Sequence, residues 1–370
     1  MSLEQNIFLS LVQAGLWEKE VQFALYGSVN YEDIYRQAQE QSVVGLVAAG
    51  LEKVTDIKVP QSLALTMAGE VLQLEQRNRA MNVFVAQLID RLRREDVYAL
   101  LVKGQGIAQC YERPLWRASG DVDLFLSYDN YQKAKKLLVP RAQRIDEEKP
   151  YNLHLEMQLS SWVVELHGTL RSGLWHKIDR EIDAVQNDVF LGKKVRSWQN
   201  SETQVLLPDV NEDVFFVFTH ILTHFFKGGI GLRQICDWCR LLWTYKGAVD
   251  ALLLERRLRR AGIKTEWMAF AALAVEYLGM PEEAMPLYTA EARWKRKASR
   301  VLAFILETGN FGQRRDKRYI REASYLKRKA ISFCQNTSDS FKHAMIFPWD
   351  SCKIWWYRLF EGIVAVGRGK

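Results

Sequence analysis

The sequence has little of what marks secreted, disulfide-bonded or membrane-spanning proteins. Its five cysteines are an odd number without framework spacing, which fits a reducing compartment better than a disulfide scaffold. No charged, then apolar, then small-residue leader opens the chain, so secretion is not expected. The longest apolar runs, such as residues 214–218, are far too short to span a bilayer. We therefore expect a cytoplasmic protein without a membrane partner.

Internal repeats and low-complexity stretches are also missing, which excludes solenoids and compositionally biased linkers. The hydrophobic share of 48% and the charged share of 26% are ordinary for a globular protein. A chain of 370 residues is long for one compact core, so two or three packed modules are the natural expectation. The patterns described below divide it into a helical region over 1–95, a core over 96–207 and a second helical region over 208–370.

The net charge of +7 is concentrated in one segment, residues 291–329. Such a segment can bind phosphate-rich partners, so nucleic acid is a possible partner and nucleic-acid processing a third functional hypothesis. A solvated helical face is the alternative, and we favour it because no base-reading feature accompanies the charge.

Period-two patterns mark the core between two helical regions. A short apolar run over 97–102 predicts a buried strand, with a helix over 107–111 after it. Residues 121–126 alternate strictly, with Asp121, Asp123 and Phe125 on one face, and Asp129 is a candidate N-cap for the next helix. Two more alternating runs, 153–159 and 163–167, predict a hairpin. Three- and four-residue spacing predicts helices over 7–17 and 34–51 and from about Asn211 onward, with a break near 309–312. A long run of good helix formers without proline predicts another helix over 63–92. The predicted class is α+β.

Two aspartates on one strand face create a physical problem. The side chains of Asp121 and Asp123 lie close enough to repel, and a divalent cation with hard oxygen ligands is the usual solution. Glu165 has the same facing on the later hairpin, so it supplies a third carboxylate if that hairpin lies beside the Asp strand. Three carboxylates around Mg²⁺ or Mn²⁺ are the apparatus of in-line phosphoryl or nucleotidyl transfer.

Candidate phosphate-binding residues precede these carboxylates. Lys103 and Gly104 close a strand and open a helix, where free amides favour an anion, and Gly104 and Gly106 allow close backbone approach. Arg117, Ser119 and Gly120 come directly before Asp121 and offer further donors. His154 and His167 are on the same face of the hairpin as Glu165, so each is a candidate to contact phosphate or to pair with a carboxylate.

The run from Leu101 to Gly104, followed by Arg-Ala-Ser-Gly-Asp-Val-Asp-Leu-Phe-Leu over 117–126 and Glu-Leu-His over 165–167, resembles the signature of an uncharacterised bacterial nucleotidyltransferase family. That family belongs to the DNA polymerase β-like superfamily. The resemblance extends into the helical segment 211–242. It implies a polymerase β-like nucleotidyltransferase core, a small mixed sheet with helices, flanked by N- and C-terminal helical regions.

The resemblance also implies an activity, the Mg²⁺-dependent transfer of a nucleoside monophosphate from an NTP to a hydroxyl. Asp121, Asp123 and Glu165 would then be the catalytic metal ligands, with Glu165 also a candidate base, and Gly104 would lie in the phosphate turn. One departure is the turn sequence Gly104-Gln105-Gly106, which lacks the serine that superfamily members place there. Lys103 and Ser119 are candidate substitutes. The alternative is a catalytically inactive nucleotide-binding or scaffold protein on the same fold.

Two pairs of metal-ligand type have simpler explanations. Cys236 and Cys239 have the spacing of a zinc knuckle, but no second cysteine pair exists and the segment has a helical pattern, so we expect core packing. His220 and His224 are one helical turn apart among phenylalanines and leucines, so core or interface positions are favoured over a metal pair.

Overall fold

The computed structural model describes residues 6–27, 29–148, 153–310 and 337–367, with the helix alone described over 358–367. The N-terminal region is helical, as predicted, with α1 (Ile7–Trp17), α2 (Tyr31–Glu40) and α3 (Val44–Leu51) before the 34-residue helix α4 (Gln61–Arg94). Helices α1 and α3 approach so closely that a Cβ on Gly15 would stand 2.0 Å from the carbonyl oxygen of Leu46. Glycine is therefore required at this crossing.

The core contains one seven-stranded mixed sheet in the order β3-β4-β5-β2-β1-β7-β6. The strands are β1 (Ala99–Val102), β2 (Asp121–Leu126), β3 (Arg144–Ile145), β4 (His154–Leu159), β5 (Trp162–His167), β6 (Val195–Asn200) and β7 (Thr203–Pro208). The predicted hairpin is confirmed as β4–β5, which pairs antiparallel. Its strand β5 lies parallel to β2, so the hairpin does stand beside the Asp strand.

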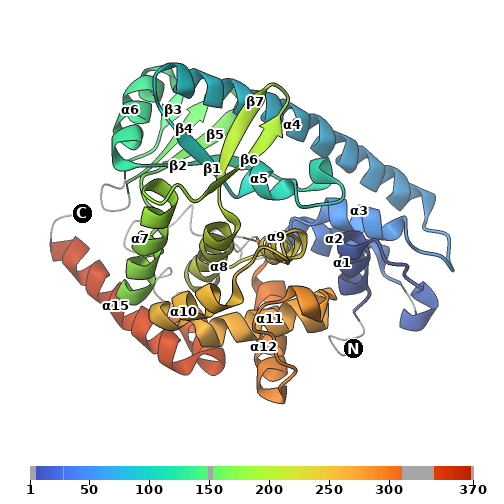
Figure 1. Ribbon diagram of the computed structural model, residues 1–370. Coiled ribbons are helices and arrows are strands. Elements are labelled where there is room, and N and C mark those ends of the chain that lie inside the picture. Colours follow the sequence, from blue (N-terminus) through green and yellow to red (C-terminus); the bar gives the residue numbers. More distant parts are fainter. Residues whose placement is uncertain (1–5, 28, 149–152, 311–336, 368–370) are drawn as a thin grey trace.

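Helices cover both faces of this sheet. On one face, α4 and α6 (Tyr128–Leu138) pack against the alternating apolar residues, such as Val122, Leu124 and Leu126 of β2. Figure 1 shows α4 running across the whole sheet and on toward the N-terminal helices. The other face carries Phe125, which packs against Phe190 and Phe216. These rings come from α7 (His176–Phe190) and α8 (Val210–Lys227), so the predicted alternation along β2 is confirmed.

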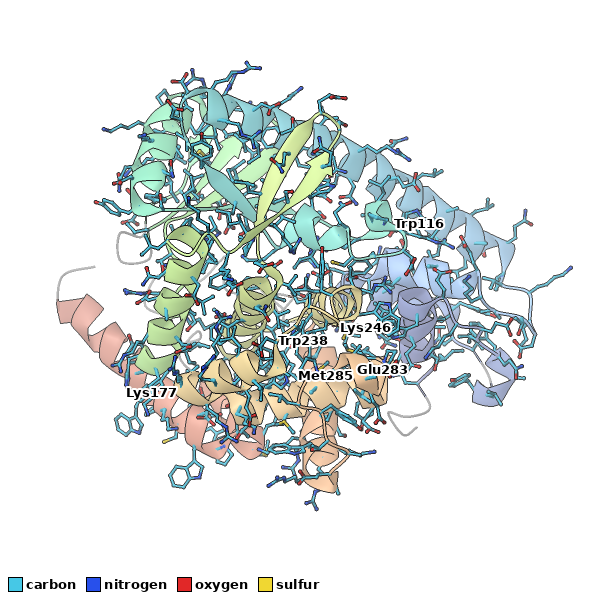
Figure 2. All side chains as sticks on the ribbon, in the orientation of Figure 1. Trp116, Lys177, Trp238, Lys246, Glu283 and Met285 are labelled. Carbon is cyan, nitrogen blue, oxygen red and sulfur yellow. The ribbon has the colours of Figure 1, made fainter. Side chains whose placement is uncertain are left out.

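The C-terminal helices form a second layer below the sheet (Figure 1). They are α8, α9 (Leu232–Thr244), α10 (Ala251–Ala261), α11 (Lys264–Leu278), α12 (Ala292–Thr308) and α15 (Pro348–Gly367). Figure 2 places Trp238 of α9 amid these helices, where its ring packs edge-on against Trp267 and beside Phe218. One apolar cluster joins these helices to α1, α3 and the lower face of the sheet, so the described regions share an interior.

Several predicted elements differ in their limits. The helix expected over 34–51 is two helices, because the chain turns at Ser42, whose φ is +56°. The helix after β1 spans Gly104–Ala108, so it begins directly at the glycine turn. Ser127, not Asp129, caps α6: its side chain accepts a hydrogen bond from the Asn130 amide, and Asp129 lies in the first turn, where its charge still favours the helix. Helix α7 and the β6–β7 hairpin were not predicted.

No described helix is long and apolar enough to cross a lipid bilayer. The part of the basic segment from residue 311 onward lies outside the described residues. Helix α12 ends at Thr308, so the predicted break in the helical pattern near 309–312 is confirmed at its described start. In α12, Arg293 and Lys295 pair with Glu291 and Glu276 at 2.8 Å. On α12, these two basic residues therefore have carboxylate partners, whereas Lys297 and Arg300 donate to the carbonyls of Ile346 and Met345.

Candidate functional site

The pairing of β2 and β5 brings the three predicted carboxylates together. Asp123 stands directly opposite Glu165 in the parallel register, and Asp121 precedes Asp123 by two residues on the same face. Asp123 is 4% exposed, so its carboxylate is removed from bulk water. The sheet thus builds a buried cluster of acids on its lower face, toward α8.

Two histidines of the β4–β5 hairpin bind this cluster. Nε2 of His167 lies 2.8 Å from Oδ1 of Asp123 and 3.2 Å from Oε2 of Glu165. Nε2 of His154 lies 3.1 Å from the same Glu165 oxygen. Burial alone would raise the pKa of Glu165, but these histidine hydrogen bonds hold it below its usual range. A carboxylate with a lowered pKa suits a role as anion or ligand better than a role as base.

Lys103 adds a cation from the end of β1. Its Nζ donates to Oδ1 of Asp123 at 2.9 Å, and burial is outweighed by the nearby carboxylates, so the pKa of Lys103 is raised. Its backbone has φ +59° and ψ −146°, which is unusual for any residue other than glycine. Such a conformation costs about 1–3 kcal/mol and is typical of functional sites. This strained turn lowers local stability, and it directs the lysine side chain toward the acids.

Asp121 is the uncompensated member of the cluster. Repulsion from Asp123, followed by burial, raises its pKa to about 6. Among the described residues, no hydrogen bond or ion pair reaches its carboxylate. Lys103 and Arg233 act on Asp121 without bonding it and do not outweigh this repulsion and burial, so the cluster keeps unfavourable negative charge that a bound cation would relieve.

A cavity of about 160 Å³ opens in front of the acids, and we call it the cationic cavity. Its far wall comes from α8 and α9. The residues that give it its charge and chemistry are Lys103, Arg117, Asp121, Asp123, Glu165 and Arg233. His220 and His224 of α8 also line it, with ring centroids 4.4 Å apart. The prediction of core or interface positions for these two histidines therefore missed that they line the same cavity as the acids.

Both α8 histidines are held neutral. Burial, helped by the charge of Lys103, lowers the pKa of His224 to about 4. Burial likewise drives the pKa of His220 well below its usual value. The α8 side of the cavity thus presents imidazoles and not imidazolium ions.

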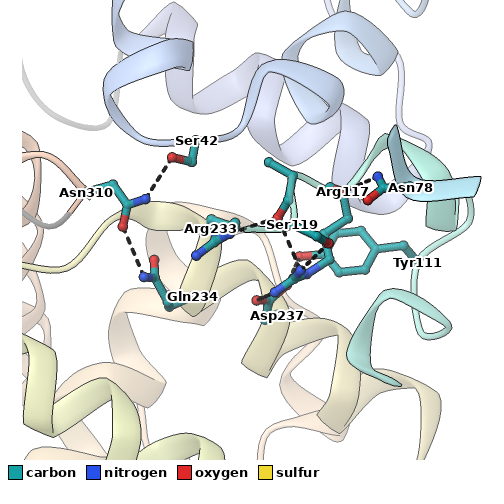
Figure 3. A network of polar contacts seen from close by, with 10 residues as sticks. Ser42, Asn78, Tyr111, Arg117, Ser119, Arg233, Gln234, Asp237 and Asn310 are labelled. Atoms are coloured by element: carbon teal, nitrogen blue, oxygen red, sulfur yellow. Dashed lines mark hydrogen bonds and ion pairs between the residues drawn. The ribbon is translucent and has the colours of Figure 1, made fainter. Parts of the chain in front are cut away.

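Arg117 lies in the cavity wall but is held by another residue. Its Nε and one terminal nitrogen donate to both carboxylate oxygens of Asp237 at 2.8 and 2.6 Å, and the two side chains are almost fully buried. Its other terminal nitrogen donates to Oγ of Ser119 at 2.8 Å, and Tyr111 donates to Asp237 at 2.7 Å (Figure 3). This network fixes the loop before β2 to α9.

Arg233, one turn before Asp237, is held more loosely. One terminal nitrogen donates to the carbonyl of Ala118 at 2.8 Å, while its Nε is buried and without a hydrogen bond (Figure 3). Burial and then the neighbouring Arg117 lower its pKa. Within the described parts of the chain, no carboxylate pairs with it.

The glycine turn has a different role at each position. Gly104 has φ +43°, so its backbone conformation favours glycine. A Cβ on Gly106 would come within 2.7 Å of the Leu207 side chain, so packing against β7 explains that glycine. Gln105 is buried and donates to Asn78 of α4 at 2.9 Å, so it does not face the cavity. Gly120 has open space beside it.

Sequence reasoning therefore missed the contribution of the C-terminal helices. Arg233 and Asp237 drew no attention, and His220 and His224 were assigned to the interior. A signal did exist for Arg233, because a cation in the first turn of a helix opposes the helix dipole and needs another reason to be there. Cys236 and Cys239, in contrast, are buried free thiols, and burial raises the pKa of both, as core packing predicts.

The donor atoms present fit a divalent cation. His154, Glu165 and His167 offer ligand atoms that all lie within 4.8 Å of one another, and Asp121 and Asp123 stand beside them. The surplus charge on Asp121 points the same way. This donor set is compatible with a divalent metal ion.

Comparison with known proteins agrees with this geometry. A family model described as an uncharacterised nucleotidyltransferase matches residues 27–279, which is more than half of the chain and includes the entire sheet as well as α8 and α9. Neither the curated proteins nor the solved structures yielded a match. The α+β chain with its clustered carboxylates belongs to this family of uncharacterised nucleotidyltransferases.

Proposed function

We propose that the chain transfers a nucleoside monophosphate from an NTP to a hydroxyl group of an acceptor, on a polymerase β-like core. The acceptor class is a small molecule, sugar, peptide or protein. The observation that carries the proposal is the register of β2 and β5, which sets Asp123 opposite Glu165 with Asp121 beside them. These acids line a cavity that also holds Lys103 and two arginines.

In this proposal Asp121, Asp123 and Glu165 hold Mg²⁺ or Mn²⁺. The cation, when bound, aligns the reacting oxygens and offsets charge that develops on the leaving pyrophosphate. The chain's own residues do the rest. Lys103, which now neutralises Asp123, is placed to turn toward a phosphate oxygen. His167 and His154 hold Glu165 ionised and oriented, as hydrogen-bonding neighbours do for ligating carboxylates.

The acceptor's place follows from a second cavity of about 140 Å³ behind the acids. It shares Lys103, Glu165 and His220 with the cationic cavity. Its other walls combine apolar side chains such as Phe216 with polar and charged ones, namely His167, Arg171, Asp213 and Thr223. In-line displacement needs the attacking hydroxyl and the leaving group on opposite sides of the phosphorus. The two cavities share Glu165 and so offer a separate place for each substrate, which supports an arrangement with the NTP in the cationic cavity and the acceptor in the second.

A catalytically inactive nucleotide-binding or scaffold protein is the other candidate. Its support is the buried Gln105, which leaves the phosphate turn without a side-chain donor. The strained backbone of Lys103 argues for the enzyme, because a silent scaffold gains nothing from that cost.

Calorimetric titration of each NTP with and without Mg²⁺ tests the proposal, followed by mass spectrometry of acceptor mixtures incubated with the NTP that binds. We expect Mg²⁺-dependent binding that Asp123→Asn abolishes, and products heavier by one nucleoside monophosphate. Mg²⁺-dependent binding without any product would favour the inactive candidate. Binding that ignores both Mg²⁺ and Asp123→Asn would refute the metal site.

A further inference from the structure

We propose that Arg233, at the start of α9, binds the phosphates beyond the α-phosphate of the nucleotide. The inference rests on the proposed function and extends it to a residue outside the sheet. It adds a triphosphate contact from the C-terminal helical region to the one proposed for Lys103 in the turn after β1.

The first argument is the charge balance of the cationic cavity. Three cations line it, and two have carboxylate partners: Lys103 bonds Asp123 at 2.9 Å and Arg117 bonds Asp237 at 2.6 Å. Arg233 is the third: within the described chain only the Ala118 carbonyl accepts a hydrogen bond from it, and the carboxylates of Asp237 and Asp121 act on it without forming an ion pair. A cation withdrawn from water without a counter-ion is costly. An anion in the cavity would remove that cost.

The second argument is the place of Arg233 in its helix. It is the second residue of α9, whose 13 residues begin at Leu232, so it stands at the positive end of the helix dipole. Arg117 lies close enough to lower its pKa. Helix dipole, neighbouring guanidinium and burial oppose this charge in the free protein, and burial with Arg117 outweighs the favourable effect of the nearby carboxylates of Asp237 and Asp121. The same three features favour a multiply charged anion once it is bound.

The third argument is the turn that lacks a serine. Gln105 takes the central position of the glycine turn but donates into the core, to Asn78 of α4. Ser119, the other candidate, accepts from Arg117. The guanidinium of Arg233 is planar and presents several donors, so it matches two phosphate oxygens at once. Arg233 can therefore supply the hydrogen bonds to the triphosphate that a serine in the glycine turn would otherwise donate.

The start of α9 is also held in place by hydrogen bonds, so it can position Arg233 for an anion. The amide of Leu232 donates to Oε1 of Gln41 at 2.9 Å, and Gln234 donates to Asn310, which in turn donates to Ser42 (Figure 3). A fixed helix end positions its arginine with little loss of entropy on binding. The contacts come from the N-terminal region, which thus supports the anion site.

The test compares wild type with Arg233→Gln and Arg233→Lys by calorimetry, using inorganic pyrophosphate alone, then ATP and AMP with Mg²⁺. Arg259→Gln, on an exposed arginine paired with Glu255, is the matched control. We expect Arg233→Gln to weaken pyrophosphate and ATP binding about ten- to a hundredfold, as loss of charged hydrogen bonds does. AMP affinity should change less than about threefold, Arg233→Lys should restore part of the ATP affinity, and the control should match wild type.

A thermal unfolding scan without ligand separates binding from folding. Because Arg233 is opposed by its surroundings, Arg233→Gln should leave the melting temperature unchanged or raise it, whereas a purely structural arginine would lower it. ATP affinity within twofold of wild type, or equal losses for ATP and AMP, would overturn the inference. If ATP binding needs Mg²⁺ and Asp123 but ignores Arg233, the proposed function stands and this inference fails. If pyrophosphate binding needs Arg233 but no NTP binds, Arg233 is an anion site, and both the proposed function and the assignment of Arg233 to a nucleotide fail.

Discussion

Replacing Asp121 by asparagine should stabilise the metal-free protein, although it removes a residue of the site. The change keeps the size of the side chain and deletes the charge that Asp123 repels. A pKa raised from 3.8 to about 6 corresponds to about 3 kcal/mol of unfavourable interaction in the ionised, folded state. Partial access to water from the cavity reduces this, so we expect a gain of about 1–3 kcal/mol at pH 7.5.

The pH dependence has a definite sign. Between pH 3.8 and about 6, Asp121 binds more protons in the folded than in the unfolded protein. Its contribution therefore lowers the free energy of unfolding as the pH rises through that window. Above about pH 6 Asp121 is ionised in both states, and the destabilisation that it causes no longer changes with pH. The stability difference between Asp121→Asn and wild type should therefore be largest at neutral pH and should vanish near pH 4.

Asp123→Asn is the matched control, two residues along the same strand. Burial would raise the pKa of Asp123, but Lys103 and then His167 hold it lowered, so its charge is favourable when folded. Removing it leaves Lys103 without its partner and should cost about 3 kcal/mol. The same chemical change on one strand should thus have opposite signs at its two positions.

Urea unfolding in EDTA, followed by tryptophan fluorescence at pH 4, 5, 6 and 7.5, measures both variants. Adding Mn²⁺ should then raise the midpoint of wild type more than that of either variant, because each has lost a proposed ligand. A metal-free Asp121→Asn protein that is less stable than wild type at pH 7.5 would refute the reasoning. So would a stability difference that does not change with pH.

Three further outcomes are expected. Asp237→Ala should lower the free energy of unfolding in urea by about 3–5 kcal/mol, because it leaves buried Arg117 without its carboxylate partner. The double variant Arg117→Met with Asp237→Leu should recover most of that loss, and a loss equal to the sum of the two single changes would contradict this prediction. Gly106→Ala should cost about 1–3 kcal/mol in thermal unfolding, because its Cβ would stand 2.7 Å from a side chain of β7, whereas Gly247→Ala, with open space around it, should be nearly neutral. Thr223→Phe should fill the second cavity and stop transfer while ATP affinity stays within about threefold; joint loss of both would move the acceptor elsewhere.

Several central strands of the sheet could be predicted from the sequence. A strand that buries one face and presents polar side chains on the other has a visible period-two alternation of apolar and polar residues. The alternation over 121–126 and 153–167 identified β2 and the β4–β5 hairpin. That the hairpin lies beside the Asp strand was stated as a condition and is met, whereas the parallel direction of the pairing was not predicted. Strands β6 and β7 escaped notice, because β6 alternates between exposed and half-buried positions and offers no apolar face.

The far wall of the site could not be predicted, for a different reason. Alternation tells which residues share a strand face but not which helix will cover that face. His220 and His224 sit in a helix rich in phenylalanine, whose pattern favours burial, and only packing shows that they border a cavity. Arg117 was expected at phosphate; the structure gives it a carboxylate partner, Asp237, 120 residues further along the chain.

Helix α9 has a consequence for anyone who would shorten this chain. Arg233, Asp237 and Arg240 follow one another at four and three residues, so they share one side of the helix. The first lines the cavity, the second holds the loop before β2, and the third donates to the carbonyls of Cys110 and of Leu16 in α1. A fragment limited to 96–207 would keep all three carboxylates and lose the wall opposite them. Because α9 also contacts Trp267 of α11 and Asn310 after α12, a shortened chain that keeps this wall should retain the elements from α1 to Asn310.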